Sequence, residues 1–548
     1  MQNIKYSEFQ NLNVGFTNLF IDYIEQKESV KKYFNDANIQ NISSWGNIIK
    51  NFNYQTENRK IVIQTLIEQN RALHCSVQTL SNIDLLQNKN TFCVVTGQQA
   101  GLFLGPLYTI YKTISAIKLC EKLKNEFPDY NFVPVFWVES EDHDLNEITT
   151  IGSITNKNEF QTFKYDVSKN NEPLKQFISA KNLLVNESIS DFIKNIFDNQ
   201  TTTEFSPQIQ NLLNQYYAIG QPFTNSFASM ISDLFRDYGL ITIDISHQQF
   251  KNILKEIFRT ELNCNHETSK NVIEQSYELE KEYHAQIKPR PINLFVSNQD
   301  GRYPLQPDEF GYFLQGTRKR YSNDELLNLL ETSPELFSPN VVLRPICQDF
   351  LLPTISYVGG PAEIAYFSQL KKVYEQFKIT MPVIFPRASC TLIEDKINNI
   401  LEKHEIEPLN FLNNFSDLTN DVLEEISEVK VEKLFLEMEN KSKNLFNETK
   451  YAILQIDPTL ENSITNIVNK LDFSLNQLKE KVRNAQKRKE EVTVSQLLKT
   501  KNHLFPDSKL QERNITIIYF MNKYGLDIVK WLYDEVSIES FEHQFINI

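Results

Sequence analysis

The sequence lacks the paired cysteines that build disulfide frameworks and zinc sites. Its cysteines are dispersed, and no two of them form a CxxC pair. A disulfide framework or a structural zinc site is therefore not expected, and a buried free thiol is the simplest interpretation of each cysteine. The six residues are Cys75, Cys93, Cys120, Cys264, Cys347 and Cys390.

Positive charge and long apolar runs are also scarce. Lysine and arginine total 56 against 70 aspartates and glutamates, a net charge of −14, which argues against broad binding to nucleic acid. The first residues contain no basic-then-apolar signal segment, and no apolar run is long enough to span a bilayer. We therefore expect a cytoplasmic protein that binds neither nucleic acid nor membranes.

The content of apolar residues is ordinary for a globular protein. They make up 41% of 548 positions, which suits two to four domains. Residues 1–90 show helical periodicity and are expected to pack on one side of the core. Residues 91–390 alternate strand-like and helix-like segments, with insertions at about 151–220 and 265–340. Because long connections rarely lack structure, we expect each insertion to form a subdomain.

Two apolar runs, each followed by a chemically distinctive turn, predict an active-site cleft. Phe92–Thr96 leads into a glycine-rich turn at Gly97–Gly101 and then a helix-like segment, Leu107–Lys124. Phe132–Val138 ends in an acidic turn, Glu139–Asp144. This order is typical of a right-handed parallel crossover, whose strands meet ligands at their carboxyl ends. Both turns are therefore expected at one edge of a parallel sheet.

The glycine-rich turn is neither a GxGxxG fingerprint nor a P-loop. Gly101 and Gly105 allow backbone N–H groups to approach an anion closely, next to the positive end of the following helix. Gln98 and Gln99 can hydrogen-bond to a sugar or a carboxylate. A tight turn without a ligand is the alternative interpretation.

The acidic turn gathers carboxylates and an imidazole within six positions. The functional interpretation makes His143 or Asp142 a general base, with Glu141 or Asp144 holding a divalent ion. The alternative is a solvated helix N-terminus, where acidic residues are favoured. If the functional interpretation holds, alanine at Asp142 or His143 should abolish product formation.

A third segment, Val341–Asp349 followed by Pro353–Glu363, repeats the plan of strand, Gly-Pro turn and helix. Its turn could face the first glycine turn across one cleft. Arg344 and Arg387 suit bidentate binding of a carboxylate or phosphate, with ordinary salt bridges as the alternative. The other polar or turn candidates on this side are Gln348, Asp349, Tyr357, Gly359, Gly360 and Glu363.

Residues 391–505 are predicted to be helical and to contain a coiled coil. The seam needs a partner, which could be the helix near Leu392–Leu401, the helix at Val431–Leu445, or another subunit. Residues 506–548 are expected to return to the core through Ile515–Phe520. The seam residues, spaced by three and four, are Ile464, Ile467, Leu471, Leu475, Leu478, Val482 and Ala485.

Several long motifs, in order along the chain, together resemble the BshC family, the cysteine ligases of bacillithiol synthesis. They are Thr96–Leu102 with Gly105–Tyr108, Phe136–Asp144, Arg344-Pro345 with Gln348-Asp349, Tyr357–Glu363, Leu510–Arg513 and Asn522–Gly525. The resemblance implies an α/β fold, a Rossmann-like parallel sheet core with two inserted connecting subdomains and a C-terminal coiled coil used in homodimerisation. It also places Tyr108 among the substrate-binding residues.

The implied reaction joins the carboxyl group of L-cysteine to the amine of glucosaminyl malate. Gln98 and Gln99 would meet sugar hydroxyls, and Arg344 or Arg387 would meet carboxylates. Because this amide formation is uphill in water, ATP and Mg²⁺ are expected. The adenylation signatures of class I synthetases are absent from the sequence, so the acyl-adenylate and acyl-phosphate routes both stay open.

Two other classes of function remain as alternatives. One is a non-catalytic dimeric scaffold or ligand-sensing protein with a Rossmann-like pocket. The other is a nucleotidylyltransferase that acts on a different carboxylic acid.

Overall fold

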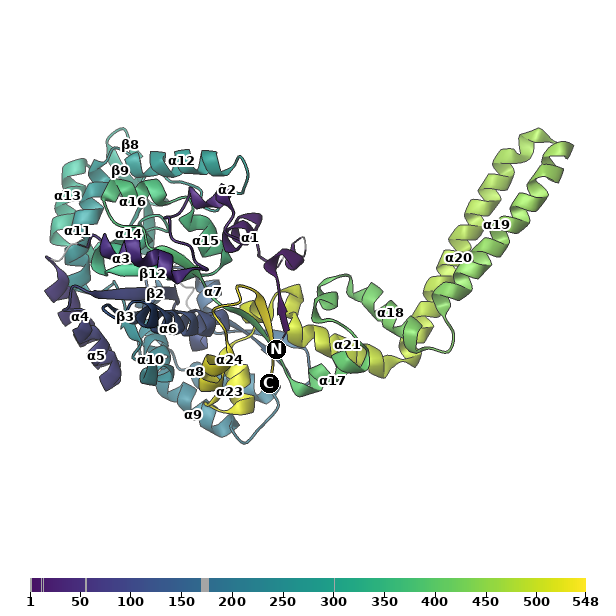
Figure 1. The fold of residues 1–548 in the computed structure, drawn as a ribbon, viewed down its shortest axis with the longest axis horizontal. Coiled ribbons are helices and arrows are strands. Elements are labelled where there is room, and N and C mark those ends of the chain that lie inside the picture. Colours follow the sequence, from purple (N-terminus) through teal and green to yellow (C-terminus); the bar gives the residue numbers. More distant parts are fainter. Residues whose placement is uncertain (1, 11, 13, 55–56, 169–176, 300) are drawn as a thin grey trace. The chain divides into compact units, whose positions relative to one another are not determined.

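The computed structural model describes residues 2–10, 12, 14–54, 57–168, 177–299 and 301–548. These residues form two compact units (Figure 1). Unit 1 comprises Met1–Thr391 with Lys509–Ile546, and unit 2 comprises Leu392–Ser508 with Asn547–Ile548. Among the described residues, no helix is both long enough and apolar enough to cross a membrane.

In the described part of unit 1, five parallel strands form the central sheet in the order β13, β12, β2, β3, β6. Almost all of their residues are buried, which explains why they appear in the sequence as continuous apolar runs. The predicted α/β fold with a parallel sheet is confirmed. The strands are β2 Thr91–Gln99, β3 Asn131–Glu139, β6 Ile241–Ile243, β12 Thr354–Gly359 and β13 Val383–Pro386.

The order of the strands creates a topological switch point between β2 and β12. From the central strand β2 the chain adds β3 and β6 on one side, and then returns to add β12 and β13 on the other. Connections that leave neighbouring strands in opposite directions open a crevice at their carboxyl ends. The turns after Gln99 and Gly359 both lie at that edge, and so does the turn after β3, because Gln99 pairs with Glu139.

Helices cover both faces of this sheet (Figure 1). Helix α6, Tyr108–Glu126, packs against β2 and β3, while α15, Pro361–Phe367, packs against β12 and β13. Proline in the first turn of α15 costs no hydrogen bond, because the N–H at that position has no helical partner. In the third segment the strand of the repeated plan is β12, and most of Val341–Asp349 forms helix α14, Leu343–Leu351.

Both regions interpreted as insertions contain secondary structure of their own. The first holds the antiparallel pair β4 Thr150–Ile154 and β5 Phe160–Lys164 and the helices α8 Ile189–Asn199 and α9 Ser206–Tyr216. The second holds helices α12 Glu267–Leu279 and α13 Asn323–Thr332 and an antiparallel sheet with the order β10, β9, β8, β7, β11. Its strands are β7 Leu294–Asn298, β8 Gly301–Asp308, β9 Gly311–Leu314, β10 Arg320–Tyr321 and β11 Phe337–Pro339. Residues 169–176 and 300 of these predicted insertions lie outside the described residues.

The N-terminal region is mostly helical, and the segment after unit 2 rejoins unit 1. Helices α1 Asn18–Ile24, α4 Arg59–Ala72 and α5 Val77–Leu85 contribute to the same buried core as the sheet. Residues 509–546 form α22 Gln511–Asn514, α23 Ile517–Tyr524, α24 Ile528–Glu535 and most of strand β15, His543–Asn547. Strand β15 pairs antiparallel with β1, Gln2–Ile4.

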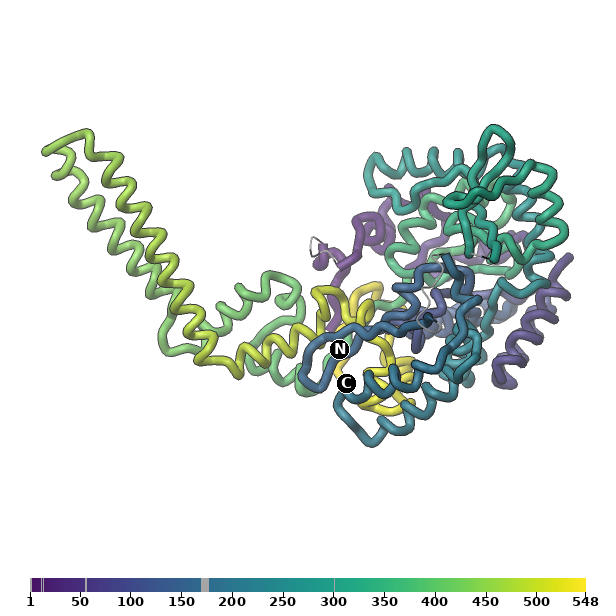
Figure 2. The backbone as a smooth tube through the Cα atoms, turned by 180° about the vertical axis from the view of Figure 1, so that it is seen from behind, coloured from purple at the N-terminus to yellow at the C-terminus, as the bar shows by residue number. Residues whose placement is uncertain are grey.

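Unit 2 contains the predicted coiled coil as a helical hairpin within the chain. Helix α19, Val431–Ile456, lies side by side with α20, Glu461–Lys489, in both views (Figures 1 and 2). Within the chain, the seam therefore packs against the helix that begins at Val431. The hairpin covers the seam only in part, because Ile464 and Leu475 are buried while Ile467 is 53% exposed. The remaining helices are α17 Asp395–Lys403, α18 Phe415–Ile426 and α21 Glu491–Leu504.

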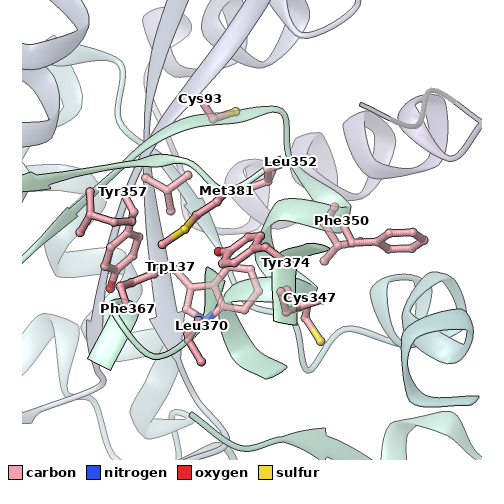
Figure 3. Close-up of a cluster of buried hydrophobic side chains, with 14 of the residues drawn as sticks. Cys93, Trp137, Cys347, Phe350, Leu352, Tyr357, Phe367, Leu370, Tyr374 and Met381 are labelled. Carbon is pink, nitrogen blue, oxygen red and sulfur yellow. The ribbon is translucent and has the colours of Figure 1, made fainter. Parts of the chain in front are cut away.

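A buried hydrophobic cluster contains side chains from the strands that end at the switch point. Trp137 of β3 and Tyr357 of β12 both belong to it, together with Cys347, Tyr374 and other residues (Figure 3). Large buried rings pack at crystal-like density and move little. The ends of β3 and β12 are therefore held rigidly where they meet the crevice.

Candidate active site

A cavity of about 320 Å³ lies at the switch point of unit 1. Both glycine turns contribute to it, as do the ends of β3 and β12, helices α6 and α15, and the C-terminal segment. The lining residues are Gly97, Gln98, Gln99, Tyr108, Lys112, Trp137, Glu139, Glu147, Arg344, Tyr357, Gly360, Pro361, Ala362, Glu363, Tyr366, Arg387 and Arg513.

The first glycine turn is fixed by close packing and by a buried lysine. A Cβ atom at Gly97 would lie 2.8 Å from the carbonyl oxygen of Trp137, so only glycine fits at this position. Lys112 Nζ donates hydrogen bonds to Gly97 O at 2.9 Å and to Gln98 Oε1 at 3.0 Å. Gln98 Nε2 in turn donates to the Tyr108 hydroxyl at 3.2 Å. The glutamine that was predicted to bind substrate is therefore held in one orientation.

The second glycine turn is organised by Glu363. Its Oε1 accepts a hydrogen bond from the Tyr357 hydroxyl at 2.6 Å, and its Oε2 accepts one from the Gly360 N–H at 2.8 Å. Lys112 Nζ lies 2.5 Å from Glu363 Oε2. Although burial opposes ionisation, the nearby lysine and the Gly360 N–H hold the pKa of Glu363 below its ordinary value. Glu363 is therefore a carboxylate committed to its neighbours.

Arg344 lines the cavity and is held there by neutral side chains. Its Nη1 donates to Gln348 Oε1 at 3.1 Å, and its Nη2 donates to the Tyr366 hydroxyl at 3.0 Å. The guanidinium carbon lies 5.1 Å from the centre of the Tyr357 ring, within range of a cation–π interaction. In the described part of the chain no carboxylate forms an ion pair with it. The arrangement leaves a positive charge available to an anionic ligand.

Glu139, the last residue of β3, is the carboxyl group of the acidic turn that lines the cavity. It accepts a hydrogen bond from Trp137 Nε1 at 3.2 Å. Burial raises the pKa of Glu139 to about 7, although Arg344 and Arg302 favour the charged form. At neutral pH this carboxyl group can therefore both accept and release a proton.

Glu141 lies apart from the cavity, in a buried ion cluster. Its side chain is 2% exposed, with Oε1 2.8 Å from Lys181 Nζ and Oε2 2.6 Å from Lys251 Nζ. Burial alone would raise its pKa, but the two lysines lower the pKa of Glu141 to about 2. The structure therefore corrects the expectation that Glu141 faces a substrate or a metal ion. Its carboxylate is used to neutralise the buried Lys251 and the partly buried Lys181.

Asp142, His143 and Asp144 also lie outside the cavity lining. Asp142 accepts a hydrogen bond from Gln99 Nε2, so it acts on the cavity through that glutamine. The His143 ring packs near Phe177 and Phe295, with Arg302 Nη1 3.4 Å from Nδ1. Burial and Arg302 lower the pKa of His143, which favours the neutral ring.

Asp144 matches the helix N-terminus interpretation of the acidic turn. It caps helix α7, Leu145–Thr149, by accepting a hydrogen bond from the Glu147 N–H at 3.2 Å. Within the described residues, no group of three or more histidine, cysteine, aspartate or glutamate side chains is arranged to hold a metal ion. The expectation that Glu141 or Asp144 holds a divalent ion is therefore not supported by their placement.

Arg387 lines the cavity, but its guanidinium fork is already occupied. Nη1 and Nη2 donate to the two carboxylate oxygens of Glu512 at 3.0 and 2.6 Å. Both side chains are buried, and Glu512 also accepts a hydrogen bond from Ser389 Oγ. The predicted bidentate clamp on a substrate is thus used within the protein, and the salt-bridge alternative describes Arg387 correctly.

Some of the predicted site residues line the cavity, and the others lie outside its lining. Those in the lining are Gln98, Gln99, Tyr108, Arg344, Tyr357, Gly360, Glu363 and Arg387. Those outside it are Gly101, Gly105, Glu141, Asp142, His143, Asp144, Gln348, Asp349 and Gly359. Gln348 supports the site by holding Arg344, and it also donates to Asp349 Oδ1 at 2.8 Å.

Sequence reasoning missed several lining residues. Lys112, a charge within the apolar helical run that became α6, could have been noticed as a buried cation that needs a partner. Glu139 was included in the acidic turn but was not chosen as a catalytic group. The missed residues are the polar and aromatic Lys112, Trp137, Glu139, Glu147, Tyr366 and Arg513, together with Gly97, Pro361 and Ala362.

Comparisons with known proteins agree along nearly the whole chain. Residues 1–388 match the family model described as "Bacillithiol biosynthesis BshC, N-terminal Rossmann-like domain", and residues 390–548 match "Bacillithiol biosynthesis BshC, C-terminal coiled-coil domain". A protein of Chloroherpeton thalassium named "Putative cysteine ligase BshC" is 34% identical, covering 98% of both chains. Proteins with the same name from Chlorobaculum tepidum and Salinibacter ruber are 34% and 32% identical, covering 96% and 97% of each chain.

Proposed function

Because the chain belongs to the BshC family of bacillithiol biosynthesis, we propose that it is a ligase that joins the carboxyl group of L-cysteine to the amine of glucosaminyl malate. One structural observation carries the proposal. The cavity combines a carboxyl group with a pKa of about 7, Glu139, with a guanidinium that has no carboxylate partner among the described residues, Arg344. A reaction between an amine and an anionic molecule requires both kinds of group.

Glu139 is the group we assign to the proton of the amine. The amine attacks the activated carboxyl carbon of cysteine, the C–N bond forms, and the activating group leaves with its electron pair. The nitrogen must then lose a proton, and a carboxylate with a pKa near the working pH accepts it most effectively. The Trp137 N–H fixes one oxygen of Glu139, so the other oxygen is left to face the substrate.

Arg344 is the group we assign to a substrate carboxylate. Its two nitrogens are oriented by Gln348 and Tyr366, and its face lies over the Tyr357 ring. A guanidinium held in this way loses little freedom when it binds an anion. We assign Gln98 and Gln99, which line the same cavity, to hydroxyl groups of the sugar.

ATP and Mg²⁺ are part of the proposal because a free carboxylate does not form an amide spontaneously in water. ATP would supply the activation of the carboxyl group. The lining residues that could meet it are Arg513 for phosphate oxygens and Glu147 for Mg²⁺. The activated species, an acyl-adenylate or an acyl-phosphate, is identified by whether pyrophosphate or phosphate is released.

The test is an assay of the purified chain with L-cysteine, glucosaminyl malate, ATP and Mg²⁺, followed by mass spectrometry of the product. We expect bacillithiol, with one equivalent of pyrophosphate or phosphate released for each product molecule. Binding of both substrates without product would favour a ligand-binding scaffold and contradict the ligase. Product formed with another acid but not with cysteine would favour the nucleotidylyltransferase that acts on a different carboxylic acid.

The variant Arg344→Gln serves as the site control for this assay. It removes the charge while keeping a polar side chain, so we expect KM for glucosaminyl malate to rise at least tenfold with an unchanged melting temperature. This corresponds to the loss of one charge-assisted hydrogen bond, about 1.5–3 kcal/mol. An unchanged KM would remove Arg344 from the binding site.

We also propose that the chain works in the cytoplasm as a homodimer through the hairpin of unit 2. The thiol substrate and the unpaired cysteines suit a reducing compartment. The hairpin exposes large apolar side chains, including Leu436 at 58%, Leu445 at 61% and Phe473 at 64%. Sedimentation should show a dimer that dissociates when all three residues are replaced by glutamate. A wild-type monomer would contradict the dimer.

A further inference from the structure

We propose that Lys112 is a positioning residue that ties the two glycine turns of the active site into one rigid unit. The inference rests on the proposed function, because it concerns the same cavity. It goes further by assigning a task to a residue that neither the sequence motifs nor the carboxylate chemistry identified.

The contacts of Lys112 connect the two halves of the fold. Lys112 lies on α6, which follows β2 and belongs to the first half of the parallel sheet. Its Nζ contacts Gly97 O and Gln98 Oε1 in the first turn and Glu363 Oε2 on α15 in the second half. An ammonium group has three N–H donors, and here there are three acceptors. Every donor is therefore committed to the protein.

This commitment excludes a direct chemical role for Lys112. A nucleophile or general base needs a free lone pair at a position that the substrate can reach. The side chain of Lys112 is 4% exposed, and its nitrogen points at three protein oxygens. Its function must therefore be exerted through the residues that it holds.

The effect of Lys112 continues through Glu363. The carboxylate of Glu363 accepts hydrogen bonds from the Gly360 N–H and the Tyr357 hydroxyl. The Tyr357 ring in turn lies beneath the guanidinium of Arg344. One ammonium group thus fixes the Gln98 side chain, the backbone of both turns, and the aromatic support of the anion-binding arginine.

The alternative is that Lys112 merely neutralises a buried carboxylate. Three variants separate the two roles: Lys112→Met, Glu363→Gln and the double variant with both changes. Each single variant leaves one buried charge without its partner, so we expect a lower melting temperature in both. The double variant removes both charges and keeps both side-chain lengths, so its melting temperature should return to the wild-type value.

Turnover distinguishes the positioning role from the structural one. In the double variant we expect kcat to stay about 100-fold below wild type, because a displacement near 1 Å in an active site costs about that much. KM should change less than tenfold, since Gln348 and Tyr366 still hold Arg344. Recovery of both the melting temperature and kcat would overturn the proposal.

A matched control and a crystal structure complete the test. Lys372 and Glu274 form an exposed pair at 2.8 Å, so the variant K372M/E274Q should change neither the melting temperature nor kcat. If the wild type shows no turnover, the proposed ligase function fails, and the crystal structure of the double variant alone decides the role of Lys112. We expect the Gln98 side chain and the Gly360 turn to be displaced. Unchanged positions of both would overturn the proposal.

Discussion

Glu139 and Glu141 lie two positions apart at the end of strand β3, and the pKa values of their carboxyl groups are shifted in opposite directions. On the cavity side, Glu139 has a hydrogen bond from Trp137 and, among the described residues, no ion pair with a lysine, and burial raises its pKa to about 7. On the inner side, Glu141 meets Lys181 and Lys251, which lower its pKa to about 2. The comparison shows that partners, and not the density of acidic residues in a turn, decide which carboxylate can exchange protons.

The two environments also require opposite tests. On the cavity side, replacing the carboxyl group should remove chemistry and leave the fold intact. On the inner side, replacement should remove stability. A result that reverses this pattern at either residue would contradict the role assigned to that residue.

The largest expected effect is on catalysis by the variant Glu139→Gln. If Glu139 takes the proton of the amine, kcat/KM should fall about 10²- to 10⁴-fold, with no loss of stability, because the neutral amide needs no counter-charge. Steady-state kinetics with mass-spectrometric detection measures this change. The control Glu187→Gln, at an exposed glutamate of the same unit, should leave kcat/KM unchanged. Wild-type turnover in E139Q would mean that the proton goes elsewhere.

The same comparison predicts a pH dependence with a definite sign. The folded chain holds the Glu139 proton more tightly than the unfolded chain, so this group makes unit 1 less stable as the pH rises from about 4.5 to about 7. For Glu141 the sign is reversed, because its stabilising charge is present above about 4.5 and lost as the pH falls toward 2. Urea unfolding between pH 4.5 and 7 should show a steeper loss of stability in the wild type than in E139Q. A smaller slope of the same sign should remain in both, because burial raises the pKa of Asp349 to about 6. Wild-type kcat/KM should increase as the pH rises past about 7, because Glu139 is then the carboxylate that accepts the proton.

The next effect in size is the loss of stability in Glu141→Ala. This variant leaves Lys181 and Lys251 without their shared carboxylate in a buried site, which should cost about 3–5 kcal/mol of unfolding free energy. Tryptophan fluorescence during urea unfolding reports on unit 1 alone, since Trp45, Trp137 and Trp531 all lie there.

The matched control for this change is Glu187→Ala, at an exposed glutamate of the same unit. We expect it to change the unfolding free energy by less than about 0.5 kcal/mol. If E141A were as stable as this control, the ion cluster would not hold the inner side of the turn together.

The smallest effects are expected from the two residues that the sequence analysis favoured as bases. Asp142→Ala should lower kcat about tenfold, because Gln99 loses the charged partner of one hydrogen bond. His143→Ala should lower kcat less than about threefold, because its ring faces Phe177, Phe295 and Arg302 outside the cavity lining. Complete loss of turnover in H143A would restore His143 as the base and remove that role from Glu139.

Local patterns in the sequence were sufficient to predict the frame of the site. Continuous apolar runs predicted buried parallel strands, and glycine with proline predicted the turns after β2 and β12, because these features depend on neighbouring residues only. The convergence of both turns on one cavity followed from the rule that parallel strands meet ligands at their carboxyl ends. The heptad-like seam likewise predicted a coiled coil, but it left the partner open between two helices of the chain and another subunit.

Residue roles inside the frame could not be predicted in the same way, because they depend on partners that are distant in sequence. The sequence suggested that Arg387 could bind a substrate, but its guanidinium group is paired with Glu512, which lies 125 positions away. The sequence suggested that Glu141 could hold a divalent ion, but its carboxylate pairs with Lys251, which lies 110 positions away. A single sequence records the residue types but not these pairings, so the direction of each pKa shift could only come from the structure.

The return of residues 509–546 to unit 1 has a consequence for how the protein is made. Synthesis on the ribosome runs from the N-terminus, so residues 392–508 of unit 2 are made before Glu512 and Arg513. Until then, the buried guanidinium of Arg387 lacks its counter-charge and the cavity lacks one of its cations. A nascent or prematurely terminated chain that lacks these residues is therefore left with an unfinished site.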